Sequence, residues 1–286
     1  MLVDVYVDER MRRLELVRSS ADVVRVVLLH WTRHVGGAPP PRWTTDDVLS
    51  WVNEDGLRAN SRKSRLTKLR PFVRWLIVRQ ELAADPTVDV ARILIPDGSP
   101  RDLTFSEARA LVAVCPDDRA RLIVVLMAQL GLRAGDVARI RIEDIDVRSR
   151  RLHVRAKGGR GEPTHWVPIP AEAWSALSAW VRAGERASGP LIRSYQRPDR
   201  GLQPATVSDL VGVWIQAAGL KEFPWDGRSS HALRHTCVQH MLDAGAGLVD
   251  VQHVLGHATI RSTEIYVRRE PPGLRAAMEA RRYLAA

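Results

Sequence analysis

The stretch "RIEDIDVRSRRLHVRAKGGRGEPTHWVPIP", residues Arg141 to Pro170, alternates between apolar and polar side chains, whereas the segments on both sides of it do not. Alternation with a period of two is typical of strands that are buried on one face. The turns "RSRR" and "KGGRG" divide the stretch into short strands. We therefore predict a small antiparallel β-sheet within a mainly α fold.

The segments that flank the predicted sheet have helical periodicity. A capped helix is expected to begin at Thr104, with Glu107 as its capping-box partner three residues later. A long apolar helix then runs to Gly131. Helical patterns return after the strands, over Glu172–Ala183 and Pro204–Ala218. Residues 104–286 are therefore expected to form one α+β domain.

The N-terminal part is predicted to be a separate helical domain, residues 1–90. Its helical segments are Asp22–Val35, Thr44–Gly56, in which Thr44 or Thr45 is the N-cap and Gly56 the stop, and Leu57–Gln80, which Pro71 kinks or divides. Residues 84–104 contain three prolines and no sustained period, so we place a linker at 91–103.

The segment from Leu57 to Gln80 holds eight basic residues and no acid in 24 positions. Its apolar seam is Leu66, Leu69, Val73 and Leu76, and beside the seam runs a stripe of Lys63, Thr67, Arg70 and Arg74. A solvated helix face usually carries both signs of charge, which favours phosphate contact over simple solvation. The candidate DNA-binding residues are Arg62, Lys63, Arg65, Lys68, Arg70 and Arg74.

The chain of 286 residues has a net charge of +10, and only four of its 43 basic residues are lysines. Arginine suits phosphate recognition, although a genome rich in G and C also favours its codons. The two cysteines lack metal-site spacing, no secretion signal appears, and the apolar run Leu122–Leu132 is too short to span a bilayer. These features indicate a cytoplasmic protein with a polyanionic partner.

Four clusters in the second part could carry chemistry. Arg133 lies in "QLGLRAGD" with Asp136 just after it, and Lys157 lies in the turn "AKGGRG". The start of a helix capped by Ser229 or Ser230 carries His231, Arg234 and His235. The segment "LGHATIRSTEIYV" supplies His257 and Tyr266.

Each cluster taken singly has an ordinary explanation as a surface arginine, a turn lysine, a satisfied helix-start histidine or a core tyrosine. Asp136 needs only the helix dipole to explain it. Five histidines fall between His231 and His257, but neither a helical glutamate between ligands nor a cysteine pair accompanies them, so we predict no metal site. Taken together, two arginines, the histidines, a lysine and a tyrosine suit phosphoryl transfer through a covalent phosphotyrosine.

The ordered set resembles the tyrosine recombinases, the phage integrase or lambda-integrase family, from about Thr104 to Tyr266. Arg133 in "GLRAGD", Lys157 before "HWVPI", and "HALRHT" with His231 and Arg234 match that family's motifs in order. His257 in "LGH" and Tyr266 nine residues later complete the match. The compact N-terminal part is similar to the core-binding domain of Xer-like or arm-less members.

The resemblance implies the roles of these residues. The catalytic set would be Arg133, Lys157, His231, Arg234, His257 and Tyr266, supported by Asp136 and His235. It implies a 3′-phosphotyrosyl intermediate, a Holliday junction and a homotetramer on DNA with inverted core-type half-sites, with no cofactor. An accessory directionality factor would fit as a further partner, and association with the nucleoid as the location. A C-terminal helix at 273–284 would dock on its own chain or on a neighbour.

Several alternatives stay open from the sequence. Integration and excision of a phage or mobile element is the favoured role, and Xer-like resolution of chromosome or plasmid dimers is the alternative. A type IB-like topoisomerase would use similar chemistry, and a DNA-binding regulator would have lost it. The segment after the nucleophile, "YVRREPP", departs from the threonine and histidine of many family members, which leaves the attachment of the tail open.

Overall fold

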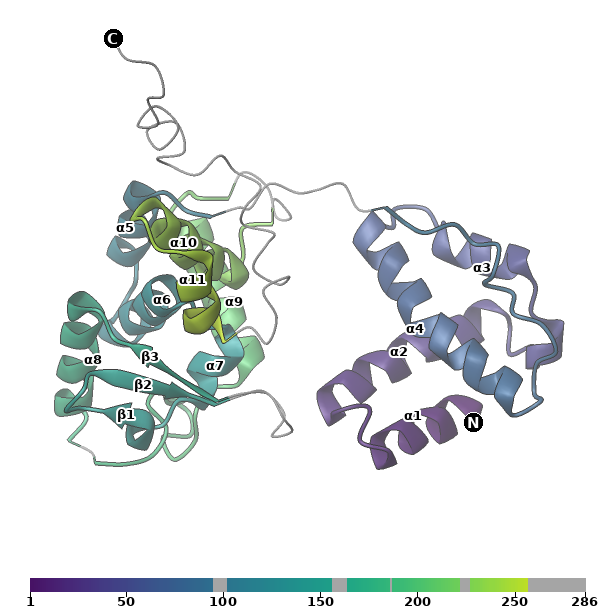
Figure 1. Cartoon of the computed structure of the whole chain (residues 1–286), viewed down its shortest axis with the longest axis horizontal. Helices are drawn as coiled ribbons and strands as arrows, with labels where there is room; N and C mark the ends of the chain where they lie inside the picture. The colour runs from purple at the N-terminus through teal and green to yellow at the C-terminus, as the bar shows by residue number, and fades with distance from the viewer. Residues whose placement is uncertain (95–101, 156–163, 186, 222–226, 257–286) are drawn as a thin grey trace, which may run out of the picture. The chain divides into compact units, whose positions relative to one another are not determined.

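The computed structural model describes residues 1–94, 102–155, 164–185, 187–221 and 227–256 (Figure 1). The chain divides into two compact units, Met1–Gly98 and Ser99–Ala286, each with its own hydrophobic core. In the described part of the chain, no helix is both long and apolar enough to cross a membrane.

The first unit is helical. Its helices are α1 (Leu2–Arg12), α2 (Arg18–His34), α3 (Thr45–Val52) and α4 (Ala59–Val78), with a 3-10 turn at Pro40–Arg42. Its core is built around Trp31, whose ring lies 5.3 Å from that of Trp43 and 5.2 Å from that of Trp51, both edge to face. Such aromatic pairs add to the free energy gained by burying their surface.

The helices of this unit differ from the sequence predictions at three points. Thr44 is the N-cap of α3, with Asp47 in a capping box, but the helix ends at Val52 and not at Gly56. Helix α4 continues through Pro71 without a second start, because the tertiary contacts of the seam offset the one hydrogen bond that proline removes. Helix α1 was not anticipated.

The second unit surrounds one buried helix. Its elements are α5 (Phe105–Ala113), α6 (Asp118–Leu130), α7 (Ala134–Arg139), a 3-10 turn (Ile142–Asp144), β1 (Ile145–Asp146), β2 (Arg151–Val154), β3 (His165–Pro168), α8 (Ala171–Ala183), α9 (Pro204–Ala217), α10 (Ser230–Asp243) and α11 (Leu248–Leu255). Helix α6 is apolar around most of its circumference and contacts α5, α7, α8 and α10 (Figure 1). A helix of this pattern belongs in the middle of a core.

The three strands form the predicted antiparallel sheet in the order β1-β2-β3. Leu152 of β2 is paired with Val167 of β3, and both side chains are buried in the core that contains α6. Asp146 closes the β1–β2 turn by accepting hydrogen bonds from the amides of Arg148 and Ser149. The mainly α class with a small antiparallel sheet is confirmed.

Candidate active site

The capped start of α10 carries three of the predicted site residues. Ser229 is the N-cap, and its hydroxyl accepts a hydrogen bond from the His231 amide at 3.4 Å. His231, Arg234 and His235 follow within the first turns, and the two imidazole rings lie edge to face with centroids 4.9 Å apart. Residues three and four positions apart share one helix face, so these three side chains leave α10 on the same side.

Arg234 is the most deeply buried of the site residues, with 3% of its surface exposed. Its Nη1 donates to the Gly131 carbonyl at 2.7 Å and its Nη2 to the Leu255 carbonyl at 2.9 Å. These carbonyls end α6 and α11, where the helix dipole concentrates negative charge and no intrahelical donor remains. The guanidinium therefore ties three helices together at one point.

Gly131 lies in close contact with residues of α10 and α11. It is the C-cap of α6 in the left-handed conformation, with φ at 63°. A Cβ added there would meet Leu255 Cδ2 at 2.8 Å and Cys237 Sγ at 3.3 Å. Both the backbone conformation and the lack of room require glycine, so the chain reaches Arg133 in a fixed direction.

Arg133 is the N-cap of α7, and Asp136 holds it in place. The Asp136 carboxylate accepts a hydrogen bond from the Arg133 amide at 3.0 Å and one from the Arg139 guanidinium at 2.8 Å. The Arg133 guanidinium lies 3.9 Å from the same carboxylate, and half of its side chain is exposed. Asp136 therefore orients this turn, while the Arg133 side chain stays accessible to a ligand.

The pKa of His231 depends on the other charged and polar groups of the site. Its pKa is lowered to about 4, first by burial of its ring and then by His235, Arg234 and Arg133. The residue nevertheless keeps access to solvent. The described site thus brings together two guanidinium groups and two imidazoles, and the nearby carboxylate of Asp136 is already engaged. Such a cluster favours an anion, and a phosphate diester fits its donors.

The lowered pKa of His231 makes the stability of the chain depend on pH. The unfolded chain takes up a proton near pH 6.5, whereas folded His231 resists it down to about pH 4, so stability falls as the pH falls through this window. Burial lowers the pKa of His235 and of His165 in the same direction. We expect His231→Gln to reduce the loss of thermal midpoint between pH 7 and pH 5, measured by calorimetry. An equal loss in the parent and the variant would contradict the assignment of the lowered pKa to His231.

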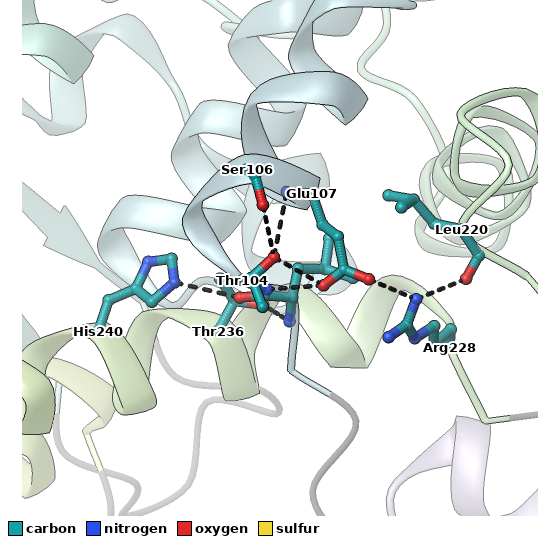
Figure 2. Close-up of polar contacts among 8 residues, drawn as sticks. Thr104, Ser106, Glu107, Leu220, Arg228, Thr236 and His240 are labelled. Atoms are coloured by element: carbon teal, nitrogen blue, oxygen red, sulfur yellow. Dashed lines mark hydrogen bonds and ion pairs between the residues drawn. The ribbon is translucent and has the colours of Figure 1, made fainter.

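The other side of α10 holds the start of the second unit (Figure 2). Thr236 Oγ1 accepts a hydrogen bond from the Leu103 amide at 2.8 Å, and His240 Nε2 donates to the Leu103 carbonyl at 3.1 Å. The Phe105 ring stacks on His240 with centroids 3.7 Å apart. These anchors were not predicted, because the partners lie more than 130 residues apart in sequence.

The predicted capping box of α5 is confirmed and has an additional partner. Thr104 and Glu107 exchange backbone and side-chain hydrogen bonds at the start of the helix. Glu107 also accepts a hydrogen bond from Arg228 at 2.9 Å, and Arg228 donates to the Leu220 carbonyl as well (Figure 2). This network joins the segment before α10 to α5. Hydrogen bonds therefore hold the start of α10 as well as the side that carries Thr236 and His240.

Other predicted residues fall outside the described part of the chain. Lys157, His257, Tyr266 and the proposed helix at 273–284 belong to this group. Among the residues that are described, no group of three or more His, Cys, Asp or Glu side chains could hold a metal ion.

The six candidate DNA-binding residues lie on α4, and the structure divides them into two groups. Four are engaged within the first unit: Arg62 with the Leu57 carbonyl, Arg65 with the Trp51 carbonyl and Glu54, Lys68 with Ser64, and Arg70 with the Val90 carbonyl. Lys63 and Arg74 are exposed on the same face of the helix. These two are therefore the better candidates for contact with a phosphate backbone.

Comparison with known proteins decides the family. Residues 101–271, more than half of the chain, match the model of the phage integrase family. The chain belongs to the phage integrase family. As a member, it is an enzyme, a site-specific tyrosine recombinase.

Two relatives and one solved structure are among the most similar. Tyrosine recombinase XerA of Pyrococcus furiosus is 34% identical over 65% of this chain and 63% of its own length, so the alignment spans less than two thirds of that relative. Tyrosine recombinase XerC of Vibrio cholerae is 29% identical over 90% of this chain and 81% of its own. A lambda integrase(75–356) dimer bound to a COC′ core site has a TM-score of 0.76 at 20% identity, covering 91% of this chain and 95% of that one, which shows the fold.

Proposed function

We propose that this recombinase cuts and rejoins duplex DNA through a 3′-phosphotyrosyl bond to Tyr266. The observation that carries the proposal is the cluster of Arg133, His231, Arg234 and His235, at the starts of α7 and α10 and beside the ends of α6 and α11. Preorganised donors of this kind stabilise the charge that develops on a phosphate as it is attacked. In sequence, His257 comes just after Gly256, the C-cap of α11, and is proposed to add a further donor.

The proposed cleavage step uses the chain's own side chains for every proton. The Tyr266 phenol oxygen attacks phosphorus as the bond to the 5′ oxygen breaks, and Lys157 gives that leaving oxygen a proton. His231 is neutral at pH 7 and is proposed to accept the proton that the phenol loses, because the bound anionic phosphate would raise the basicity of its ring. The new bond conserves the energy of the broken phosphodiester, so rejoining needs no ATP.

The first unit is proposed to be a core-type DNA-binding domain within residues 1–90, connected through a linker at 91–103 to the catalytic domain at 104–286. The exposed Lys63 and Arg74 of α4 support this assignment, as does the core site bound in the lambda integrase structure. Its partner is double-stranded DNA, and phosphate contacts on α4 would fix the register of the protein on it.

The double variant Lys63→Ala/Arg74→Ala is expected to weaken DNA binding without unfolding the first unit. Each lost phosphate contact reduces the slope of log K against log salt by about 1, so a loss of about 2 is predicted. Binding would be titrated at several salt concentrations. Arg12→Ala/Arg13→Ala removes the same charge from exposed positions at the C-terminal end of α1 and is the matched control. An unchanged slope in the α4 variant would contradict the proposed contact.

Recombination is proposed to proceed in a homotetramer on two synapsed duplexes, each with inverted core-type half-sites, through a Holliday junction. A helix at 273–284 would dock within the tetramer, and an accessory factor would set the direction. The protein would act in the cytoplasm, in association with the nucleoid or, if phage-encoded, in the host. The proposed biological role is integration and excision of a phage or mobile element.

A second role, resolution of chromosome or plasmid dimers, is favoured by the XerA and XerC names of the relatives. The two roles differ in their sites. Recombination between two copies of one chromosomal site would support resolution, and recombination between two different attachment sites would support integration.

The proposed chemistry can be tested by capturing covalent protein–DNA adducts from a library of DNA duplexes. Nicked suicide duplexes with randomised arms would be incubated with the protein, and covalent adducts that survive denaturation would be sequenced. A recombinase of this kind yields adducts that share one motif. Specific binding without adducts would favour a DNA-binding regulator, and relaxation of supercoiled plasmids that lack the motif would favour a topoisomerase. Either outcome would contradict the proposal.

A further inference from the structure

A histidine outside the predicted set contacts the end of α11. His165, the first residue of β3, points its ring at Val254 and Gly256. The His165 Nε2 atom lies 3.1 Å from the Val254 carbonyl oxygen. A carbonyl oxygen only accepts, so the ring must carry its hydrogen on Nε2. The contact therefore fixes both the tautomer and the orientation of the ring.

The same ring leaves no room for a side chain at Gly256. A Cβ built on Gly256 would overlap with His165 Cε1, closer than any real contact permits. Gly256 is also the left-handed C-cap of α11, with φ at 61°. The ring and the glycine backbone thus lie in direct contact, and this contact sets the direction in which the chain leaves the helix.

Two consecutive carbonyls at this helix end are held from two different elements. His165 of β3 donates to the carbonyl of Val254, and Arg234 of α10 donates to that of Leu255. Arg234 is one of the residues of the proposed phosphate site, and His165 donates to the neighbouring carbonyl of the same helix end. The end of α11 is therefore fixed relative to the site residues on α10.

In sequence, His165 lies between two proposed catalytic residues that the described part does not include. Strand β3 follows the segment that contains Lys157, and Gly256 immediately precedes His257. The hydrogen bond from β3 to α11 is thus a direct connection between the two segments that lead to these residues. A displacement of about 1 Å at a reacting group can cost about 100-fold in rate, so such a connection has consequences for catalysis.

From this geometry we infer that His165 is a positioning residue for DNA cleavage, acting through the end of α11. The inference rests on the proposed function, because it is the proposed phosphate contact of His257 that His165 would position. Its role differs from that of a core histidine: removing the donor changes the rate of cleavage more than it changes the stability or the DNA affinity.

The experiment compares His165→Ala with His165→Gln on a duplex selected by the capture library. Gln can place an amide N–H near the position of Nε2 and donate to Val254, whereas Ala cannot. At saturating protein, His165→Ala is expected to form the covalent adduct at least about tenfold more slowly, with the dissociation constant for DNA within about twofold of the parent. His165→Gln is expected to recover most of that rate.

His153→Ala is the matched control, because His153 lies on the adjacent strand β2 with its ring against Trp166. It should leave the rate of adduct formation unchanged. A normal rate in His165→Ala, or a Gln variant as slow as the Ala variant, would overturn the inference.

A second measurement on the DNA-free protein separates this inference from the proposed function. Gly256→Ala should lower the thermal midpoint more in the parent, where the new methyl meets the His165 ring, than in the His165→Ala background. Equal losses in both backgrounds would overturn the contact itself. If the parent forms no adduct on any duplex, the proposed function fails, whatever the thermal midpoints of the Gly256→Ala variants show.

Discussion

Arg234→Met should abolish cleavage and lower the free energy of unfolding of the second unit by about 3 kcal/mol. The substitution removes two charged hydrogen bonds and leaves the carbonyls of Gly131 and Leu255 buried at the ends of α6 and α11. Denaturant unfolding would measure the stability, and adduct formation on a selected duplex would measure the activity.

Arg119→Met is the matched control for this prediction. Arg119 is also buried, lies near the opposite end of α6, and donates to one carbonyl, that of Arg193, at 3.0 Å. We expect it to lose stability but to cleave normally while folded. If Arg234→Met cleaved as well as Arg119→Met, Arg234 would be a structural residue only, and the proposed phosphate contact would be wrong.

The second large effect is expected for Tyr266→Phe, which removes only the phenol oxygen. If that oxygen is the nucleophile, adduct formation falls to background, while DNA affinity and thermal midpoint stay close to those of the parent. A gel of denatured reaction mixtures would measure the adduct. Tyr195→Phe is the control, since the exposed Tyr195 hydroxyl donates to the carboxylate of Asp117. An adduct with normal yield in Tyr266→Phe would remove the basis of the proposed mechanism.

The fold class was predictable because its signals are local. The alternation over Arg141–Pro170 and the capping box at Thr104 depend on residues within a few positions of one another. The continuous helix through Pro71 was not predictable, because what stabilises it is the burial of Leu69, Phe72 and Val73 in the core. Local propensity is overridden there by tertiary packing.

The site was predictable as a set of residue types but not as a geometry. Spacing on one helix was enough to place His231, Arg234 and His235 together. It gave no sign that Arg234 would hold the ends of two other helices, or that His165 would contact Gly256. The contact between Arg234 and Leu255 joins residues 21 positions apart, whereas the others join residues about 90 or more positions apart. Pairings over such separations depend on the complete fold.

The same limit applies to the basic face of α4. The basic stretch predicted six equivalent candidates, and charge alone could not rank them. The structure separates Arg65 and Arg70, which hold backbone carbonyls of their own unit, from the exposed Lys63 and Arg74. Long basic side chains often contribute to packing as well as to charge, so a count of positive residues overestimates the number of phosphate contacts.

The most direct test of the central claim is to identify the residue that carries the DNA. The covalent adduct, trimmed with nuclease and digested with trypsin, would be analysed by mass spectrometry. The account predicts that the peptide of residues 262–268, which contains Tyr266 as its one tyrosine, carries the added nucleotide mass. Attachment to Tyr195, or to any residue other than Tyr266, would contradict it.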